Sequence, residues 1–256
     1  VLEWVIGFAQ DHAGFNVLSD YFDFVRGADT WKVLGSSRVL VDGLMTPEVH
    51  RRLGWSLLAG AVVCGGLLAA ARGPGLIGLA LVGAILGFCY AAPPVGLKYR
   101  ALGDLAVFLA FGPLLVLGAY WVQAGAVAAA PLLFSFPLAT LTVAILHGNN
   151  YRDIGVDAQA GFRTFAGMLG PVGSAWYYLA LLLSAYGVGT VLLLSAGAAL
   201  PALAVLLTLP LAVRNIRVAF NTRRVAFTYL DLLTAQLHMA YGIVWVAVIA
   251  LKGITA

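Results

Sequence analysis

The charged residues of this chain fall between long apolar stretches, and the lengths of those stretches predict membrane-spanning helices. No Asp, Glu, Lys or Arg occurs in residues 53–71, 73–97, 105–151, 164–213 or 232–251. A helix that crosses a bilayer needs about 20 apolar residues. The first two stretches and the last therefore predict one helix each, and the two long stretches predict two helices each.

Each long stretch has a break near its middle. The breaks run from Gly125 to Pro131 and from Ser195 to Pro201, where Gly and Pro favour turns. The pattern thus predicts seven complete spans after the opening segment. That segment carries Glu3, Asp11 and His12 and shows no secretory signal. Two interpretations stay open for it: an amino-terminal helix is missing or truncated, or a neighbouring helix covers this acid-bearing segment.

Composition supports a membrane protein. Hydrophobic residues make up 62% of the 256 residues and charged residues 10%, with a mean hydropathy of +0.95. Soluble domains carry about 25% charged residues, so a water-soluble fold is excluded. Cys64 and Cys89 both lie in apolar stretches and are interpreted as small hydrophobic residues.

The basic residues predict the orientation of the spans. If the predicted helices alternate in direction, Arg72 and Lys252 lie on one side and the other Lys and Arg residues lie on the opposite side. The positive-inside rule assigns that opposite side to the cytoplasm. The residues on it are Arg26, Lys32, Arg38, Arg51, Arg52, Lys98, Arg100, Arg152, Arg163, Arg214, Arg217, Arg223 and Arg224.

Most of the acidic residues fall on this same basic side, which the positive-inside rule does not explain. They form two similar clusters at helix ends. One contains Asn16, Asp20, Asp23 and Asp29, and the other contains Asn149, Asn150, Arg152, Asp153 and Asp157. An even number of predicted helices separates the clusters, so both emerge on one side of the membrane. The chain then reads as two weakly similar halves that deliver acidic helix ends to one cavity.

The spacing within the clusters favours a metal site. Asn16, Asp20 and Asp23 follow i, i+4, i+7 spacing, which puts them on one helical face, and the second cluster is spaced similarly. Like charges so placed repel unless a cation sits between them. Mg²⁺ prefers oxygen ligands and binds a few carboxylates together with phosphate oxygens. Solvated helix ends are the alternative interpretation.

Basic residues near the clusters complete a predicted diphosphate site. Lys98 and Arg100 follow the Pro93-Pro94 break, close to Tyr90. Arg and Lys both suit phosphate oxygens, although anchoring of the topology explains Lys98 and Arg100 equally well. The further basic candidates are Arg38, Arg152 and Arg163. His147 and His238 lie within apolar helices, where a hydrogen-bonded core role is expected.

Three segments resemble the UbiA superfamily of membrane aromatic prenyltransferases. Residues 16–30 read NVLSDYFDFVRGADT, residues 96–115 read GLKYRALGDLAVFLAFGPLL, and residues 147–164 read HGNNYRDIGVDAQAGFRT. They are most similar to the branch that prenylates 1,4-dihydroxy-2-naphthoate for menaquinone, and to its animal relative that makes vitamin K2. Asp29 fits the late final aspartate of that branch's first motif. Ser19 stands where the family usually has Asn, and the family's first helix, with its Arg-Pro motif, is absent.

The resemblance implies an all-α, polytopic transmembrane bundle of nine spans, about eight of them visible in a single domain over residues 1–256. It implies a multi-pass protein of the cell membrane whose active site faces the cytoplasm. A polyprenyl diphosphate, an aromatic acceptor and the lipid bilayer are the expected partners, with no nucleic acid. Mg²⁺ would be held by Asp20, Asp23, Asp29, Asp153 and Asp157, of which all but Asp29 are also expected to be catalytic. The diphosphate would be bound by Asn16, Arg38, Tyr90, Lys98, Asn149, Asn150, Arg152 and Arg163.

Two further alternatives remain at this stage. The acceptor could be 4-hydroxybenzoate, a chlorin or a lipid precursor, and a cation-coupled transporter is the rival from another class. Transporter sites usually lie near the bilayer midplane, whereas both clusters here lie at one face. Asp104, at the start of a predicted helix, is a candidate to hold or deprotonate a hydroxyl of the acceptor, and helix capping explains it equally well.

Overall fold

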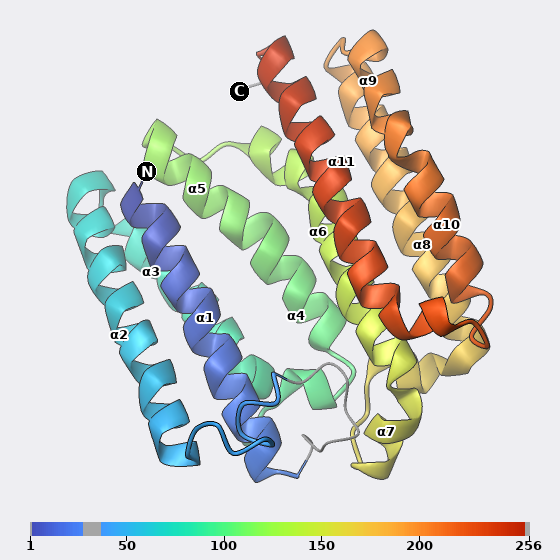
Figure 1. The fold of residues 1–256 in the computed structure, drawn as a ribbon. Helices are drawn as coiled ribbons and strands as arrows, with labels where there is room; N and C mark the ends of the chain where they lie inside the picture. The colour runs from blue at the N-terminus through green and yellow to red at the C-terminus, as the bar shows by residue number, and fades with distance from the viewer. Residues whose placement is uncertain (1, 28–36, 254–256) are drawn as a thin grey trace.

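The computed structural model describes residues 2–27 and 37–253, without the side chains of residues 2–5, 200 and 252. These described residues are almost entirely helical (Figure 1). The α-helices of the first half are α1 (Leu2–Val25), α2 (Pro47–Arg72), α3 (Gly75–Ala91), α4 (Gly103–Leu109) and α5 (Leu115–Ala124). Those of the second half are α6 (Ala129–Arg152), α7 (Ile154–Gln159), α8 (Phe165–Ser195), α9 (Ala199–Val205), α10 (Leu209–Ala219) and α11 (Leu230–Lys252).

Short non-α turns join or interrupt these helices. They are the 3₁₀ turns η1 (Leu97–Tyr99), η3 (Leu206–Thr208) and η4 (Val225–Tyr229), and the π-turn η2 (Ala110–Leu114) between α4 and α5. Pro113 lies inside η2 and has no N–H to donate, which disfavours a regular α-helix there. The segment α4–η2–α5 nevertheless continues in one direction as one apolar span, Gly103–Ala124.

Six of the seven spans predicted after the opening segment are confirmed by length and composition. Six helical segments of the described chain are long and apolar enough to cross a membrane. They are Pro47–Arg72, Gly103–Ala124, Ala129–Arg152, Phe165–Ser195, Pro201–Ala219 and Val225–Leu251. The seventh predicted span corresponds to the apolar helix α3, which is shorter than these six. The acid-bearing α1 lies before them. No membrane is present, so the assignment rests on length and composition.

Both predicted breaks fall where expected. The helix α5 ends at Ala124 and Gly125 adopts φ +70°, a left-handed conformation that glycine accepts without a Cβ clash. The second break separates Ser195, the last residue of α8, from Ala199, the first of α9. A third interruption was not predicted: Gly170, with φ +67°, kinks α8 just before Pro171.

The opening segment forms one continuous helix that packs along α2. An added Cβ on Gly14 would approach the Leu58 side chain to 2.8 Å, and one on Gly54 would approach Leu18 equally closely. Small residues therefore let the two helix backbones come together, as is common in membrane bundles. The opening segment therefore packs against α2 through Gly14 and Leu18.

The two acidic helix ends lie at the same end of the bundle. In Figure 1 the chain enters α1 at one end and leaves it at the other, where α6 also ends and α7 lies. The helices α1 to α5 occupy one side of the bundle and α6 to α11 the other. The site motifs therefore come from opposite halves.

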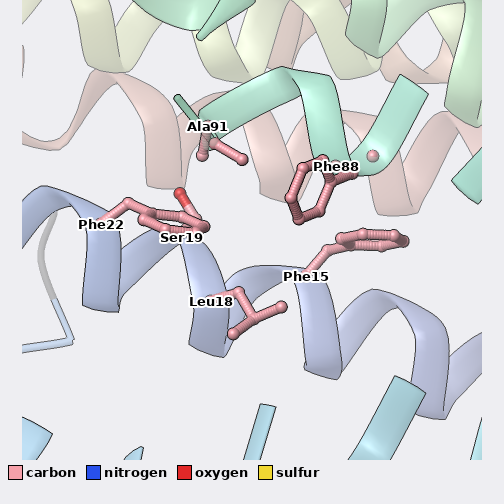
Figure 2. A pocket seen from close by; sticks show the side chains of 8 residues that line it. Phe15, Leu18, Ser19, Phe22, Phe88 and Ala91 are labelled. Carbon is pink, nitrogen blue, oxygen red and sulfur yellow. The ribbon is translucent and has the colours of Figure 1, made fainter. Parts of the chain in front are cut away.

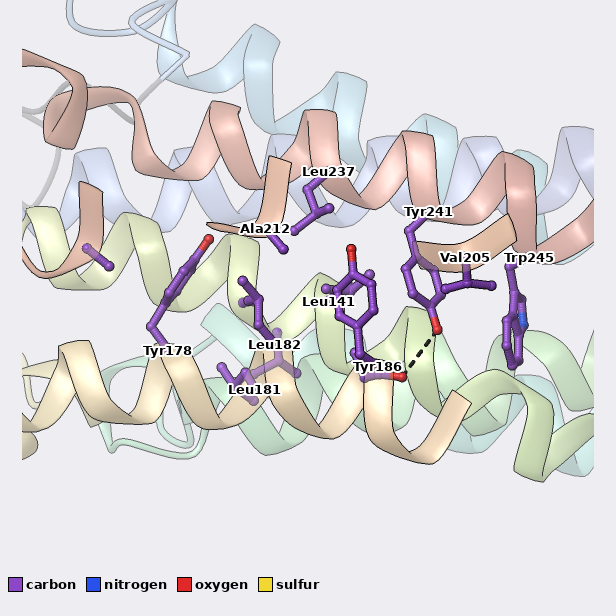
Figure 3. Packing of buried hydrophobic residues seen from close by; sticks show 14 of the residues in the cluster. Leu141, Tyr178, Leu181, Leu182, Tyr186, Val205, Ala212, Leu237, Tyr241 and Trp245 are labelled. Carbon is purple, nitrogen blue, oxygen red and sulfur yellow. Dashed lines mark hydrogen bonds between the residues drawn. The ribbon is translucent and has the colours of Figure 1, made fainter. Parts of the chain in front are cut away.

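The densest packing lies in the second half, between α6, α8, α10 and α11 (Figure 3). Tyr178, Tyr241 and Trp245 are almost fully buried there, and the Tyr241 hydroxyl donates to the Ala185 carbonyl oxygen over 3.2 Å. Outward-facing apolar side chains such as Val62 and Leu207 stay about three-quarters exposed, at 74% and 77%. A bilayer would cover such surfaces.

Candidate active site

The first acidic helix end is held by two side chains from the turn after α3. Lys98 Nζ lies 2.5 Å from Asp23 Oδ2, and it also donates to Ser19 Oγ over 2.6 Å. The Tyr99 hydroxyl donates to the other Asp23 oxygen. The side chains of Lys98 and Asp23 are 17% and 15% exposed, so the ion pair is largely shielded from solvent. Lys98 is thus oriented toward the first motif and does more than anchor the topology.

The same turn also contacts the second half of the chain. The Arg163 backbone N–H donates to the Tyr99 carbonyl oxygen over 3.2 Å, and the rings of Tyr99 and Phe162 lie 4.5 Å apart. The Arg26 guanidinium stacks 4.5 Å from the centre of the Tyr99 ring on the first-half side. Burial and the adjacent Asp23 carboxylate both raise the pKa of Tyr99, so its hydroxyl stays a proton donor. Tyr99 therefore contacts residues from both halves of the chain at this end of the bundle.

The second acidic helix end is organised by Arg152. Its Nε and one Nη donate to the two Asp153 oxygens over 2.9 and 2.8 Å, and its other Nη donates to Asp231 Oδ2 over 2.8 Å. The side-chain oxygen of Asn149 accepts a further hydrogen bond from this guanidinium. Arg152 is 8% exposed, so it orients Asp153 from within the bundle and ties α6 to α11.

Asp157 connects the two motifs electrostatically. It lies on the short helix α7, outside the membrane-spanning segments, and its pKa is raised from 3.8 to about 6. Burial is the largest cause and repulsion from Asp153 the second, while Lys98 and the Thr164 hydroxyl favour the ionised form and Asp23 again opposes it. These charges act on Asp157 from the first half of the chain. The direct contacts between the two ends are the Arg163–Tyr99 hydrogen bond and the Tyr99–Phe162 ring contact, which bring the segments that carry the two motifs together.

The donor set suits Mg²⁺ held jointly with a substrate. Among the described residues no three acidic, His or Cys side chains are close enough to hold an ion by themselves. Mg²⁺ usually binds one or two carboxylates plus phosphate oxygens and waters, so a preformed cage is not required. Asp23, Asp153 and Asp157 offer such carboxylates from the two sides of the site. Asp29, the remaining predicted ligand of the first motif, lies outside the described residues.

The other predicted site residues lie at varying distances from this centre. Tyr90 is near it, with its ring centre 5.8 Å from Lys98 Nζ. Asn16 is exposed and hydrogen-bonds His12 over 3.1 Å, and Arg38 pairs with Asp42 over 2.7 Å on the loop before α2. For the remaining three the contacts are sparse. Asp20 and Asn150 are half-buried and make no side-chain hydrogen bond within the described part of the chain, and the Arg163 side chain is exposed.

Three residues of the site were not singled out as site residues from the sequence. Tyr99 follows Lys98 directly, and its role depends on the fold that brings it to Asp23. Asp231 begins the last apolar stretch and is the last acidic residue of the chain, a position that could have marked it. Ser19 stands where the family usually has Asn, and its hydroxyl accepts a hydrogen bond from Lys98.

A narrow apolar groove borders Ser19 between α1 and α3 (Figure 2). Phe15, Leu18 and Phe22 line it from α1, and Phe88 lines it from α3. It does not admit a water molecule. Aromatic and aliphatic side chains therefore flank Ser19 on this side.

Comparison with known proteins agrees with this arrangement. The model of the "UbiA prenyltransferase family" matches residues 2–251. The "UbiA prenyltransferase domain-containing protein 1" of Mus musculus is 38% identical over 239 residues, which cover 92% of this chain and 68% of that protein. The Homo sapiens protein of the same name is 37% identical over the same shares. The Dictyostelium discoideum protein is 36% identical over 188 residues, 71% of this chain and 57% of that protein.

Proposed function

Because the chain belongs to the UbiA prenyltransferase family, we propose that it transfers a polyprenyl group from polyprenyl diphosphate to 1,4-dihydroxy-2-naphthoate. The acceptor loses its carboxylate as carbon dioxide, and the product is demethylmenaquinone in its reduced, hydroquinone form. The observation that carries the proposal is the meeting of the Asp23–Lys98 pair with Asp153 and Asp157 at one end of the bundle. Such a set of carboxylates and cations binds a metal diphosphate.

The residues of the chain have separable parts in this reaction. Asp23, Asp153 and Asp157 would hold Mg²⁺, which when bound neutralises charge on the leaving diphosphate. Lys98 and the Tyr99 hydroxyl, both at Asp23, are placed to donate hydrogen bonds to diphosphate oxygens. The bond between the prenyl C1 and the diphosphate oxygen breaks, and its electron pair leaves with the diphosphate. A ring carbon of the acceptor then bonds to C1, and departure of carbon dioxide returns an electron pair to the ring.

The choice of acceptor rests on motif resemblance. The first motif ends in Gly27-Ala28-Asp29 and the other motif contains Asn149-Asn150, and both features resemble the naphthoate branch. The names of these relatives specify a prenyltransferase domain and no acceptor. A UbiA-type enzyme with another acceptor, such as 4-hydroxybenzoate, is the alternative candidate. Transport is disfavoured, because both acidic clusters lie at one end of the bundle and not at its middle.

We place this end of the bundle in the cytoplasm, with the protein in the cell membrane. The support is the distribution of Lys and Arg along the sequence. Val25 and Ala158 are exposed positions next to the two motifs. Cysteines introduced there, with Cys64 and Cys89 replaced by Ser, should both react with a membrane-impermeant reagent added from the cytoplasmic side. Reaction from opposite sides would contradict a shared site.

An acceptor competition assay tests the proposed activity. Membranes containing the protein are incubated with one polyprenyl diphosphate, Mg²⁺ and equal concentrations of 1,4-dihydroxy-2-naphthoate and 4-hydroxybenzoate. The expected result is prenylated naphthoquinol without its carboxylate, formed faster than any benzoate product. Faster use of 4-hydroxybenzoate would overturn the acceptor assignment. Absence of a prenylated product with both acceptors would overturn the proposed reaction.

A further inference from the structure

A buried carboxylate and a buried imidazole face each other just inside the site. Asp104 lies in the first turn of α4 and is 6% exposed, and His147 on α6 is fully buried. His147 Nδ1 lies 3.5 Å from Asp104 Oδ2. Within the described part of the structure neither Asp104 oxygen has a hydrogen-bond partner. The capping interpretation of Asp104 is wrong, because Leu102 occupies the N-cap and no side chain caps this helix.

The contacts of His147 constrain where its ring hydrogens lie. His147 Nε2 lies 3.2 Å from the Ser174 carbonyl oxygen. A carbonyl oxygen can only accept, so Nε2 carries a hydrogen. If Nδ1 and the Asp104 carboxylate were both unprotonated, two acceptor lone pairs would face each other in a buried site and repel. A hydrogen on Nδ1 or on Oδ2 removes this repulsion.

The pair lies directly behind the diphosphate end of the site. A Cβ added to Gly103, the neighbour of Asp104, would lie 3.3 Å from Lys98 Cα and 3.7 Å from the Tyr90 ring. Tyr90 is close enough to both Asp104 and Asp23 to interact electrostatically with each. Asp104 is thus adjacent in the fold to the Asp23–Lys98 pair, and an aromatic ring could lie there beside the carbon that diphosphate leaves.

A purely structural role does not account for the unpartnered oxygens of Asp104. Buried polar groups in native proteins are nearly always hydrogen-bonded, because an unsatisfied one is costly. The titratable groups that face Asp104 are Tyr90 on α3, His147 on α6 and Tyr177 on α8, and the Lys98 backbone lies beside the neighbouring Gly103. The Tyr177 hydroxyl interacts with the Asp104 carboxylate, but neither Asp104 oxygen accepts a hydrogen bond of good geometry within the described part of the structure. Oδ1 is closed off from solvent and retains acceptor capacity that the protein itself does not fill.

We propose that Asp104 is the catalytic base that takes the proton of a phenolic hydroxyl on the aromatic acceptor, with His147 as its positioning partner. This inference rests on the proposed function. The acceptor O–H bond breaks, its proton moves to Asp104 Oδ1, and its electron pair stays on oxygen as phenolate. His147 keeps the proton of the pair at Nδ1 and, as imidazolium, offsets the phenolate charge. The electron-rich ring then attacks the prenyl C1 as that carbon separates from diphosphate.

The test compares three purified variants with the wild type in prenyl transfer. Asp104→Asn keeps the shape and removes the base, and His147→Asn keeps an N–H donor close to the position of Nδ1 without a titratable proton. Glu48→Gln is the matched control, because Glu48 also lies in the first turn of a helix, α2, but is exposed. Asp104→Asn should lower kcat by about 10²- to 10⁴-fold, the usual contribution of general base catalysis. The KM for polyprenyl diphosphate and the melting temperature should stay near their wild-type values.

Two readouts separate a base from a structural residue. The kcat of Asp104→Asn should rise about tenfold per pH unit as the acceptor hydroxyl ionises in solution, which closes the gap to wild type at high pH. Acceptor analogues with more acidic hydroxyls should also show a smaller deficit. His147→Asn should fall between Asp104→Asn and wild type, and Glu48→Gln should match wild type. A kcat for Asp104→Asn within about threefold of wild type, or a deficit independent of both pH and acceptor acidity, would overturn the assignment.

This outcome is distinct from failure of the proposed function. If the wild type prenylates an aromatic acceptor and Asp104→Asn does so equally well, the family activity stands and the role of Asp104 is rejected. If the wild type prenylates no aromatic acceptor, the proposed reaction and this role fall together. If the melting temperature shows that Asp104→Asn does not fold, two other measurements still test the proposal. One is the kcat of His147→Asn. The other is the wild-type rate across the acceptor series, which should depend less on acceptor acidity than the rate of His147→Asn does.

Discussion

All three nitrogens of the Arg152 guanidinium are engaged inside the protein. They bind Asp153 in a fork, reach across to Asp231 on α11 and contact Asn149 one turn earlier on α6. Arginine suits this role because its planar donors match carboxylates in pairs. The sequence predicted a diphosphate contact for Arg152. The contacts point to the positioning of Asp153 as its principal task.

Replacement of Arg152 by Met should destabilise the fold. It would leave the partly buried Asp153 and Asp231 without their cation, and the loss of one partner from a fully buried pair costs about 3–5 kcal/mol, which is an upper limit for this partly exposed one. Arg217→Met is the matched control, because Arg217 is exposed in the last turn of α10. Thermal unfolding in detergent should show a clear fall in melting temperature for Arg152→Met alone. Equal melting temperatures for the two variants would contradict this network.

The raised pKa of Asp157 predicts a pH-dependent stability in Mg²⁺-free buffer. With a folded pKa of about 6 against an ordinary 3.8, the folded state binds more protons than the unfolded state between these values. Stability from this group is therefore present at low pH and lost as the pH rises through about 6. Solvent screening limits the effect to roughly 1 kcal/mol.

Asp157→Asn removes this titration. The variant should be more stable than wild type at pH 7 and close to it at pH 4, when melting temperatures are compared at each pH. A difference between variant and wild type that does not change with pH would contradict the raised pKa. Subtracting wild type from variant at each pH removes the contribution of the other titrating groups.

Part of this site could be predicted from residues alone. The Asn-then-Asp clusters and Lys98 were identified because charges at the ends of apolar helices are unusual enough to indicate function. The contacts of Tyr99 with Asp23, and of Asp231 with Arg152, could not, because they join segments separated by about 80 residues. His147 was expected to be a satisfied core residue. One ring nitrogen fits that expectation, and the other faces Asp104.

At the scale of elements, the interior of the bundle depends on close approach of α4–η2–α5 to α6. Gly112 lies in the π-turn, and a Cβ there would sit 2.5 Å from the Ala139 Cβ on α6. The length of the charge-free stretch predicted this span and its end near Gly125. It could not predict the π-turn, because that turn reflects the packing of Gly112 and Pro113 against a neighbouring helix.

Gly112→Ala should therefore lower stability by about 1–3 kcal/mol, because the added methyl overlaps a backbone-attached atom that cannot rotate away. Gly187→Ala on α8 is the control, since nothing lies within 4 Å of its added Cβ. It should be neutral or stabilising, as expected for Gly→Ala within a helix. Melting temperatures of the two variants in the same detergent decide this. A stable Gly112→Ala protein would show that the helices are not in close contact there.

At the scale of the whole molecule, two halves of unequal packing share one functional end. The larger buried cluster belongs to residues 141–248, whereas the first half contributes a small cluster around Leu68, Leu76 and Val122. The number and the order of the spans followed from charge-free lengths, and the shared end followed from the even number of helices between the motifs. The residue contacts between the two halves depend on side-chain packing. The spacing of apolar and polar residues along the sequence does not predict such contacts.

The direct test of the shared site is the binding of a polyprenyl thiolodiphosphate, which resists ionisation, to purified protein by calorimetry with and without Mg²⁺. Binding should require Mg²⁺, and Asp23→Asn in the first half and Asp157→Asn in the second should each weaken it at least about 30-fold, equivalent to about 2 kcal/mol. Glu48→Gln should bind like wild type. Wild-type affinity in either aspartate variant, or equally tight binding without Mg²⁺, would contradict a diphosphate site built from both halves.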